Sequence, residues 1–167
     1  MISKKAEIED LAVLGENILV EDYSVIKNGA KIGTNTKIHV NVLIDNDVSI
    51  GSNVKIQNNV VIPHGVTIED GVFVGPGVNF TNDKWPRSIT PQGKLKSNAD
   101  WHVSETLVRY GASIGAGSTI VCGITIGRWA MIGAGSVVVK SVPDFAIVCG
   151  NPAAIVGYTN ENGEKKS

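Results

Sequence analysis

The sequence predicts an all-β protein: a parallel β-helix of six-residue repeats, with one long extruded loop and a short capping segment at its C-terminal end. Three observations support this prediction. An apolar residue recurs at every sixth position, a residue suited to tight turns follows it by three, and the pattern fails once, between Phe80 and Val108. An α-helix repeats every 3.6 residues and a flat strand every two, so neither explains a period of six.

The first block of repeats runs from Leu14 to Phe80 without a missed apolar position. Short strands joined by turns would place these side chains in stacked columns inside the coil. One coil cannot bury its own apolar side, so stability is expected to grow as neighbouring coils are added. The repeated positions are Leu14, Val20, Ile26, Ile32, Ile38, Ile44, Ile50, Ile56, Ile62, Ile68, Val74 and Phe80.

The turn position of the first block holds Gly, Asn or Asp everywhere except at Tyr23. These residue types accept a positive φ or bond their own backbone in turns. The second block has glycine at this position, with Trp129 as its exception. Because turns explain the spacing of the glycines, and the sequence has neither G-x-G-x-x-G nor a Walker A motif, we expect no nucleotide-binding loop of those kinds.

The interruption predicts one long loop over residues 81–107. Residues 86, 92, 98 and 104 would continue the register, but none of them is suited to an apolar column. The pattern restarts at Val108 and continues through residues 114, 120, 126, 132 and 138, out of phase with the first block. Long loops inside compact domains are usually functional or disordered, and Trp85, Trp101 and His102 favour an ordered, functional one.

For the end of the chain, the sequence predicts a capping segment followed by a polar tail. Gly150-Asn151-Pro152 and an apolar stretch from Ala153 to Val156 follow the last repeat, and we expect them to cover the open end of the coil. The sequence therefore predicts a single domain over residues 1–160 and a polar, frayed tail over residues 161–167.

Composition excludes several classes of function. The chain has 167 residues and a net charge of −1, so nothing favours nucleic acid or an anionic membrane as a partner. The charged N-terminal residues do not resemble a secretory signal, and no apolar run is long enough to cross a membrane, so we expect a cytoplasmic protein. Two cysteines, Cys122 and Cys149, form no disulfide framework and are expected to be small packing residues.

The three histidines of the chain are candidates for metal ligands or bases. His39, His64 and His102 occupy different positions relative to the repeat and lack ligand spacing, so we expect no metal site. His64 lies just after an apolar position at a predicted corner of the coil, 18 residues before Asn82. It is a candidate general base, with a surface histidine bonded to water as the alternative.

Several segments together resemble the hexapeptide-repeat acyltransferases. These are the repeat itself, Gly111-Ala112-Ser113-Ile114-Gly115-Ala116-Gly117, Ile132-Gly133-Ala134-Gly135-Ser136 and Gly150-Asn151-Pro152-Ala153. The resemblance covers roughly residues 14–158. It implies a left-handed β-helix, a homotrimer with active sites between subunits, and acetyl-CoA as the acyl donor.

The start of the loop, Phe80-Thr81-Asn82-Asp83-Lys84-Trp85-Pro86-Arg87, is similar to the signature of N-acetyltransferases that modify nucleotide-linked amino sugars. Relatives acting on the 3-amino group of UDP- or dTDP-sugars for surface polysaccharides, lipopolysaccharide included, look most similar. The resemblance implies that Asn82 and Asp83 orient the amine. Thr81, Lys84 and Arg87 are then expected to bind substrate, and Lys94 is a further cation for a diphosphate or a sugar carboxylate.

The same resemblance implies where the coenzyme binds. Ala116 and Ala134, each followed by a glycine (Gly117 and Gly135), match tight turns that receive the pantetheine arm. Lys140 matches a basic residue that meets the coenzyme phosphates, and Pro152-Ala153 matches a segment near the adenine. Many relatives have Arg after this Pro-Ala pair, where this chain has Ala154.

The absence of a histidine at residues 82 and 83 separates two enzyme hypotheses. O-acetylating relatives carry a catalytic histidine near this corner, because a sugar hydroxyl needs a base worth about 10²–10⁴ in rate. A sugar amine needs only to be bound unprotonated beside the thioester. Acetylation of an amine is therefore the leading hypothesis; O-acetylation with His64 or His102 as base, and a non-catalytic carbohydrate-binding scaffold, are the alternatives.

Overall fold

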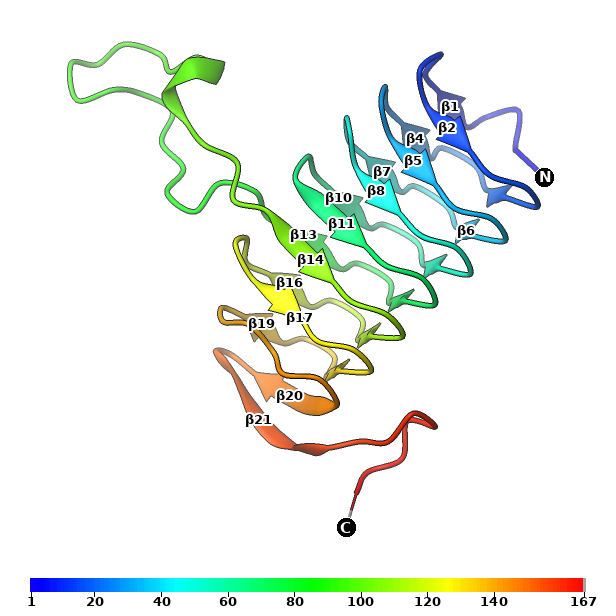
Figure 1. Cartoon of the computed structure of the whole chain (residues 1–167). Helices are drawn as coiled ribbons and strands as arrows, with labels where there is room; N and C mark the ends of the chain where they lie inside the picture. Colours follow the sequence, from blue (N-terminus) through cyan, green and yellow to red (C-terminus); the bar gives the residue numbers. More distant parts are fainter. Residues whose placement is uncertain (167) are drawn as a thin grey trace.

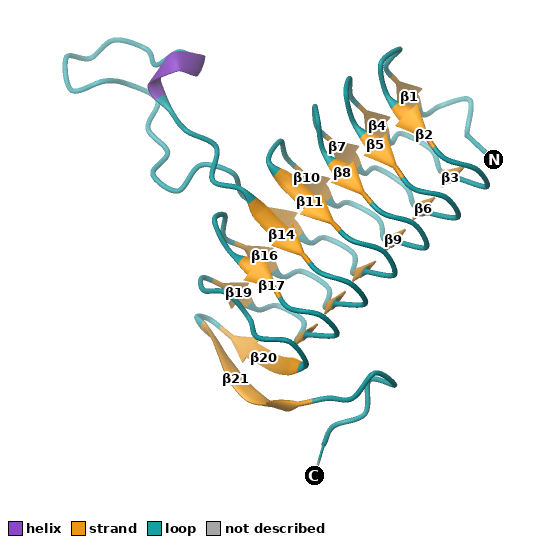
Figure 2. Cartoon of the chain, in the orientation of Figure 1, coloured by secondary structure: helices purple, strands orange, loops and turns teal. Residues whose placement is uncertain are grey.

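The computed structural model describes residues 1–166 and has the predicted fold, a left-handed parallel β-helix. Figure 1 shows the coils stacked along one axis, with the N-terminus at one end, the C-terminal strands at the other and one loop projecting from the side. Figure 2 shows that almost all regular structure is short strand, joined by turns. Because a turn interrupts the chain every six residues, most strands are only two residues long.

Three parallel sheets form the sides of the prism. The seven-stranded sheet contains β1 (Glu7–Ile8), β4 (Val25–Ile26), β7 (Leu43–Ile44), β10 (Val61–Ile62), β13 (Asn79–Phe80), β16 (Thr119–Ile120) and β19 (Val137–Val138). The six-stranded sheet contains β2 (Val13–Leu14), β5 (Lys31–Ile32), β8 (Ser49–Ile50), β11 (Val66–Ile68), β14 (Thr106–Val108) and β17 (Thr125–Ile126).

The eight-stranded sheet forms the third side and reaches the C-terminal end. It contains β3 (Leu19–Val20), β6 (Lys37–Ile38), β9 (Lys55–Ile56), β12 (Phe73–Val74), β15 (Ser113–Ile114), β18 (Met131–Ile132), β20 (Ala146–Gly150) and β21 (Ala153–Tyr158). The last two strands pair antiparallel, so the expected terminal segment is a hairpin that ends this sheet. The hairpin ends the parallel stacking because β21 is antiparallel to the other strands of this sheet.

The apolar columns lie inside the prism as the six-residue period predicts. Ile26, Ile44 and Ile62 pair in register on successive coils of one sheet and are completely buried. Burying an isoleucine side chain contributes about 1.5–3 kcal/mol, so each added coil extends the core by several such increments. The core continues unbroken through Phe80 into the second block.

All the expected turn positions adopt the left-handed conformation, including the two exceptions. Tyr23 has φ 61° and Trp129 has φ 54°, although neither residue type favours this region. The ring of Trp129 packs edge-on against Tyr110, with ring centroids 5.6 Å apart. The stacked coil therefore imposes the turn conformation even where the residue does not prefer it.

The extruded loop is shorter than residues 81–107. Ile50 pairs with Ile68, 18 residues on, whereas Ile68 pairs with Val108, 40 residues on. The extra length explains why the two blocks are out of phase. The end of the predicted loop is wrong because Thr106 and Leu107 already belong to β14, where they pair with Val66 and Thr67 of β11.

The polar tail also differs from the prediction, because its described part is not frayed. Thr159 forms an antiparallel bridge with Lys165, and the Asn160 N–H donates to the Glu164 carbonyl at 3.0 Å. The tail closes a tight turn whose backbone groups satisfy one another. Ser167, the last residue of the predicted tail, lies outside the described residues.

Candidate active site

Two edges of the prism carry the residues singled out by sequence. The Asn82 edge consists of the turns that leave the seven-stranded sheet: residues 63–65, 81–105, 121–124 and 139–141. The Ala116 edge consists of the turns that enter the same sheet: residues 75–78, 115–118, 133–136 and, at the C-terminal end, 149–153. Since each edge repeats once per coil, residues far apart in sequence are stacked along it.

His64 and Asn82 lie on successive coils of the Asn82 edge. The Asn82 side-chain amide donates to the His64 carbonyl oxygen at 3.3 Å. A carbonyl oxygen can only accept, so this bond assigns the nitrogen of the amide and leaves its oxygen as a free acceptor. The Asn82 backbone carbonyl in turn accepts from the Ser104 N–H at 2.9 Å, which fixes the other end of the loop to the same place.

The ring of His64 is held by the coil beneath it. Nδ1 lies 2.9 Å from the Asn46 carbonyl oxygen and 3.8 Å from the Asp47 carboxylate. Because the carbonyl accepts, Nδ1 carries the proton, and in the neutral ring Nε2 then presents a lone pair. This tautomer is compatible with a base, but His64 lines neither of the two loop cavities formed by the described residues.

The Asp45 carboxylate supports this stack from below. It accepts from Lys27 Nζ at 3.0 Å and, more weakly, from the His64 N–H at 3.4 Å. Partial burial acts to raise the pKa of Asp45, but the hydrogen bonds from Lys27 and from the Asn46 and His64 backbone outweigh it, so the pKa is lowered. The hydrogen bond and charge of Asp45 raise the pKa of Lys27. This pair was not among the residues predicted from the sequence, because only the stacking of the coils brings Lys27 and Asp45 together.

Thr81 and Asp83 both have structural partners. The Thr81 hydroxyl accepts from the Cys122 N–H at 3.0 Å, joining two coils across the base of the loop. The Asp83 carboxylate accepts from the Trp85 N–H at 2.8 Å, a local turn that starts the loop. Both side chains are half-buried, and the second oxygen of Asp83 remains available to a ligand.

The loop itself is ordered by two local motifs. Near its tip, Ile89 and Leu95 form an antiparallel bridge, and the Lys96 N–H donates to the Ser88 carbonyl at 2.9 Å. On the return, a 3₁₀ turn, η1 (Asn98–Asp100), is closed by a capping box between Ser97 and Asp100. These contacts give the extruded loop local secondary structure of its own.

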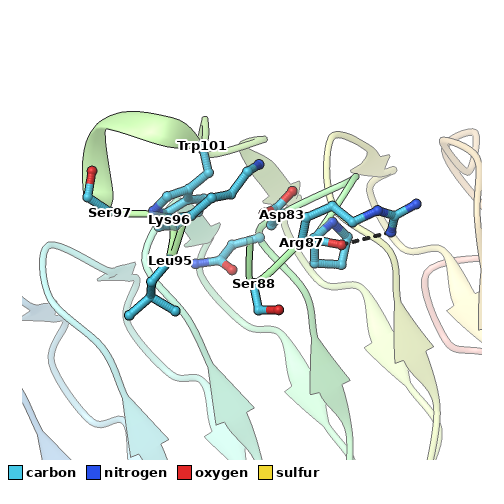
Figure 3. A pocket seen from close by; sticks show the side chains of 9 residues that line it. Asp83, Arg87, Ser88, Leu95, Lys96, Ser97 and Trp101 are labelled. Carbon is cyan, nitrogen blue, oxygen red and sulfur yellow. Dashed lines mark hydrogen bonds between the residues drawn. The ribbon is translucent and has the colours of Figure 1, made fainter. Parts of the chain in front are cut away.

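A cavity of about 500 Å³ lies between the outgoing part of the loop, residues 82–88, and its returning part, residues 95–101. Figure 3 shows side chains from both ends of the loop around it, with Asp83 seen between Lys96 and Arg87. Its lining residues are Asn82, Asp83, Pro86, Arg87, Ser88, Leu95, Lys96, Ser97 and Trp101. A second cavity of about 250 Å³ adjoins it and includes Lys84, Trp85 and His102. The cavities thus combine one side-chain amide (Asn82), two carboxylates (Asp83 and Asp100), three cations and two indoles.

Sequence reasoning missed Lys96 and Trp101 as site residues. Both lie far from the signature at residues 80–87, and only the folding back of the loop brings them to it. The available signal was the composition of the loop, in which aromatic residues alternate with cations. Lys94, one of the expected cations, lies on the hairpin turn and lines neither cavity.

The Ala116 edge has the shape expected for close approach of a ligand to the backbone. A Cβ added at Gly117 or Gly135 would meet nothing within 4 Å, so both turns face open space. Ala116 and Ala134 are exposed, and within residues 1–166 neither N–H has a protein acceptor. At the edge between the six- and eight-stranded sheets, acidic side chains occupy such N–H groups, as Glu69 does for Tyr110.

The remaining expected coenzyme residues divide between the two edges. Pro152 and Ala153 extend the Ala116 edge towards the C-terminus, in the turn that joins β20 to β21. Lys140 follows β19 and lies on the Asn82 edge instead. The strands of the seven-stranded sheet therefore separate Lys140 from the alanine turns within one chain.

Two negative findings complete the description. Among residues 1–166, no group of three or more His, Cys, Asp or Glu side chains is arranged to hold a metal ion. The part of the chain that the structure describes also contains no helix long and apolar enough to cross a membrane.

Comparisons with known proteins agree with the fold and with the predicted resemblance. The family described as bacterial transferase hexapeptide (six repeats) matches residues 47–82. The dTDP-3-amino-3,6-dideoxy-alpha-D-galactopyranose 3-N-acetyltransferase of Aneurinibacillus thermoaerophilus is 60% identical over 53 residues, 32% of this chain and 28% of that protein. The serine acetyltransferase of Escherichia coli K12 is 43% identical over 88 residues, 52% of this chain and 31% of that protein. The chain thus covers less than a third of either curated relative.

Solved structures share the fold at lower identity. A mutant of AntD, an N-acyltransferase from Bacillus cereus in complex with dTDP and coenzyme A, superposes with a TM-score of 0.78 at 22% identity, over 91% of this chain and 86% of that one. A mutant of perosamine N-acetyltransferase from Caulobacter crescentus, in complex with CoA and GDP-perosamine, gives 0.57 at 22% identity, over 93% of this chain and 55% of that one. The resemblance to hexapeptide-repeat acyltransferases is confirmed.

Proposed function

We propose that this protein is an acetyl-CoA-dependent N-acetyltransferase acting on the amino group of a nucleotide-linked amino sugar. The observation that carries the proposal is the cavity enclosed by the two ends of the extruded loop. It presents an amide oxygen and a carboxylate at its inner end and cations on the loop, with no histidine among its lining residues. The partial match to a dTDP-3-amino-sugar N-acetyltransferase supports the same substrate class.

Asn82 and Asp83 would orient the amine. Since the Asn82 amide nitrogen is bonded to the His64 carbonyl, its oxygen faces outward as an acceptor for an amine N–H. An amine that donates to this oxygen and to Asp83 directs its lone pair away from them, towards the thioester. The nitrogen attacks the thioester carbonyl, an N–C bond forms, the C–S bond breaks, and the amine proton goes to the departing thiolate or to solvent. Holding the two reactants together supplies much of the rate gain.

The Ala116 edge would hold the coenzyme. The N–H groups of Ala116 and Ala134 are free to donate to amide carbonyls of a pantetheine arm, and the open turns at Gly117 and Gly135 let the arm approach. Pro152 and Ala153 would meet the adenine end. Coenzyme A supplies the acetyl thioester, and the protein binds and positions it. Lys140 lies on the other edge, so it would reach the coenzyme phosphates only from a second copy of the chain.

The separation of the two edges favours sites shared between subunits of a homotrimer. The seven-stranded sheet lies between the edges, and four of its seven outward positions are apolar: Val25, Leu43 and Val137 are half-buried and Val61 is exposed. The other two sheets instead expose lysines, at Lys31 and Lys37 among others. An apolar side flanked by both half-sites suits packing against another copy, which would bring the Ala116 edge of one chain to the Asn82 edge of its neighbour.

The second candidate function is O-acetylation with His64 as base. Two observations favour it: the Nδ1 contact with the Asn46 carbonyl leaves Nε2 as a proton acceptor, and serine acetyltransferases match half of the chain. An amine remains the first proposal because His64 stands outside the loop cavity.

Both reactions use substrates of the cytoplasm, and acetylated amino sugars of this class serve surface polysaccharides such as lipopolysaccharide.

The test is release of free thiol from acetyl-CoA across a panel of acceptors. The panel contains UDP- and dTDP-linked 3-amino and 4-amino sugars, with L-serine and a simple galactoside as hydroxyl acceptors. We expect turnover only with a nucleotide-linked amino sugar. Turnover with serine or the galactoside alone would overturn the amine assignment, and failure to bind acetyl-CoA in a calorimetric titration would overturn the enzyme assignment.

Shared sites can be tested by mixing two inactive variants. Asn82→Ala damages one edge, and Ala116→Trp blocks the other by filling the open turn. Each alone should be nearly inactive, whereas refolded mixtures of the two should recover activity, because some interfaces then combine two intact edges. Mixtures that stay inactive while light scattering shows a trimer would argue that each chain forms its own site.

A further inference from the structure

Lys96 and Trp101 occupy a special position in the loop, because they form the wall between the two cavities. Both residues line the larger cavity and the smaller one, and of the other lining residues only Asp83 does the same. Figure 3 shows Trp101 and Lys96 on the same side of the larger cavity, opposite Arg87. Lys96 and Trp101 are half-buried, whereas most of the loop is exposed. Neither residue has a role in the amine chemistry described above.

Trp101 is held in place by the local structure that precedes it. The Asp100 carboxylate accepts from both the N–H and the hydroxyl of Ser97, at 2.8 Å each, and closes the 3₁₀ turn that ends on Trp101. By contrast, Trp85 is 77% exposed, and the local structure around it is held by one hydrogen bond, from its own N–H to the Asp83 carboxylate. A fixed, partly exposed indole beside a polar cavity is suited to stacking on a planar ring, because every nucleobase offers a π-face.

The two cations of the larger cavity are only partly balanced by carboxylates: Asp83 lines the same cavity, and the pKa of Asp100 is lowered by its hydrogen bonds from Ser97 and, to a smaller extent, by the charge of Lys96. No carboxylate among residues 1–166 lies within salt-bridge distance of Lys96 or Arg87. The Arg87 guanidinium donates only to the neighbouring Pro86 carbonyl, at 3.0 Å, and the nearby Asp100 carboxylate is committed to Ser97. Two unpaired cations facing one cavity fit a ligand that carries two adjacent negative groups, as a diphosphate does.

The lining residues of the larger cavity are arranged in an order that matches the parts of a nucleotide-linked sugar. Asn82 and Asp83 stand at its inner end, where the loop leaves the prism, and Trp101 and Lys96 stand on the part of the loop that folds back over it. A sugar at the inner end would therefore have its diphosphate beside Lys96 and Arg87 and its base beside Trp101.

We infer that the loop cavity binds the nucleoside diphosphate end of the substrate, with Trp101 stacking on the base and Lys96 contacting the diphosphate. This inference rests on the proposed function, which it deepens by assigning two residues outside the signature at residues 80–87. The start of the loop, beside the prism, then supplies the reacting end of the site, and the part of the loop that folds back supplies its affinity for nucleotide.

Calorimetric titration of the full chain with UDP and with dTDP tests the assignment. Trp101→Ala should weaken binding about 5- to 100-fold, the usual effect of losing one base–aromatic stack. Lys96→Gln should weaken it about 10-fold and make binding less dependent on salt. The matched variants Trp85→Ala and Lys94→Gln, which remove the same groups at positions outside the larger cavity, should weaken binding less than Trp101→Ala and Lys96→Gln do.

The outcomes separate this assignment from the proposed function. If the wild type binds UDP or dTDP and both Trp101→Ala and Lys96→Gln bind as tightly, the assignment is wrong and the proposed function is untouched. If the wild type acetylates amino-sugar nucleotides while Trp85→Ala or Lys94→Gln are the variants that lose affinity, the site lies elsewhere on the loop. If the wild type neither binds a nucleotide nor transfers acetyl groups, both proposals fail. Melting curves for each variant confirm that the prism is intact.

Discussion

The side-chain amide of Asn82 donates a hydrogen bond to the backbone carbonyl of His64, 3.3 Å away on the preceding coil. This contact fixes which end of the amide faces the cavity. It also ties Asn82, the second residue of the extruded loop, to the prism, so the orientation of the amide is set by the scaffold before substrate binds.

Replacing Asn82 should impair the reaction with the amine. We expect Asn82→Ala to lower kcat/KM about 10- to 100-fold, the loss that follows from removing one hydrogen bond to a polar group held in the site. Asn82→Asp should be at least as damaging, because a carboxylate would face the His64 carbonyl and would hold the substrate as an ammonium ion. Steady-state kinetics with the best acceptor of the panel measures both.

The control for Asn82 is Asn58→Ala, an exposed asparagine on a turn of the Ala116 edge in an earlier coil. It should leave kcat/KM within about twofold of the wild type, as expected of a surface substitution. Wild-type kinetics for Asn82→Ala would contradict the orienting role.

Removing the imidazole of His64 should have little effect on an amine acceptor. The ring is bonded to the Asn46 carbonyl and lies outside the loop cavity, so His64→Ala should change kcat less than about fivefold, well below the effect of losing a general base. The pH profile of kcat should keep its shape. A loss of about 10²-fold, with the His-dependent limb of the profile removed, would show instead that Nε2 accepts the proton.

The ion pair of Lys27 and Asp45 should make stability depend on pH at both ends of the scale. The lowered pKa of Asp45 contributes stability above the unfolded value, about 3.9, that is lost as pH falls through the folded pKa. The raised pKa of Lys27 contributes stability below the unfolded value, about 10.4, that is lost as pH rises through the folded pKa. Between these limits both contributions are present.

Urea unfolding at several pH values measures this dependence. Asp45→Asn should flatten the acid limb and Lys27→Gln the alkaline limb, each relative to the wild type. Lys31→Gln, a change of the same charge on an exposed strand residue, is the control for the second variant. Identical slopes for Asp45→Asn and the wild type below about pH 4 would contradict the prediction.

Two glycines with the same backbone conformation should differ in their tolerance of a side chain. Gly111 and Gly77 have φ values of 68° and 67°. A Cβ at Gly111 would lie 2.8 Å from the Trp129 ring, whereas at Gly77 its nearest neighbour is 4.0 Å away. Gly77→Ala should cost about 1–2 kcal/mol for the left-handed conformation alone. Gly111→Ala should cost clearly more, because the indole must also move. Unfolding free energies from urea titration compare the two directly, and equal costs would show that Trp129 shifts freely.

Much of the fold can be predicted from the sequence because each coil repeats the same two local requirements. A side chain at every sixth position must be buried, and a turn must follow three residues later, so the spacing predicts the strands, the turns and the columns from Ile26 to Ile132. Tyr23 and Trp129 break the residue preference but not the conformation, since stacking on adjacent coils decides it. The end of the loop was predicted less well, because the start of β14 depends on pairing with β11 and not on the repeat alone.

The candidate site divides in the same way. The repeat alone predicts where the prism is interrupted and which residues begin the loop, because Thr81, Asn82 and Asp83 follow the last apolar position of the first block, Phe80. The repeat does not predict that Lys96 and Trp101 fold back over them, or that Lys140 stands on a different edge from Ala116 and Ala134. A six-residue period specifies position within a coil, whereas contacts across the loop and across the sheet depend on how the coils stack.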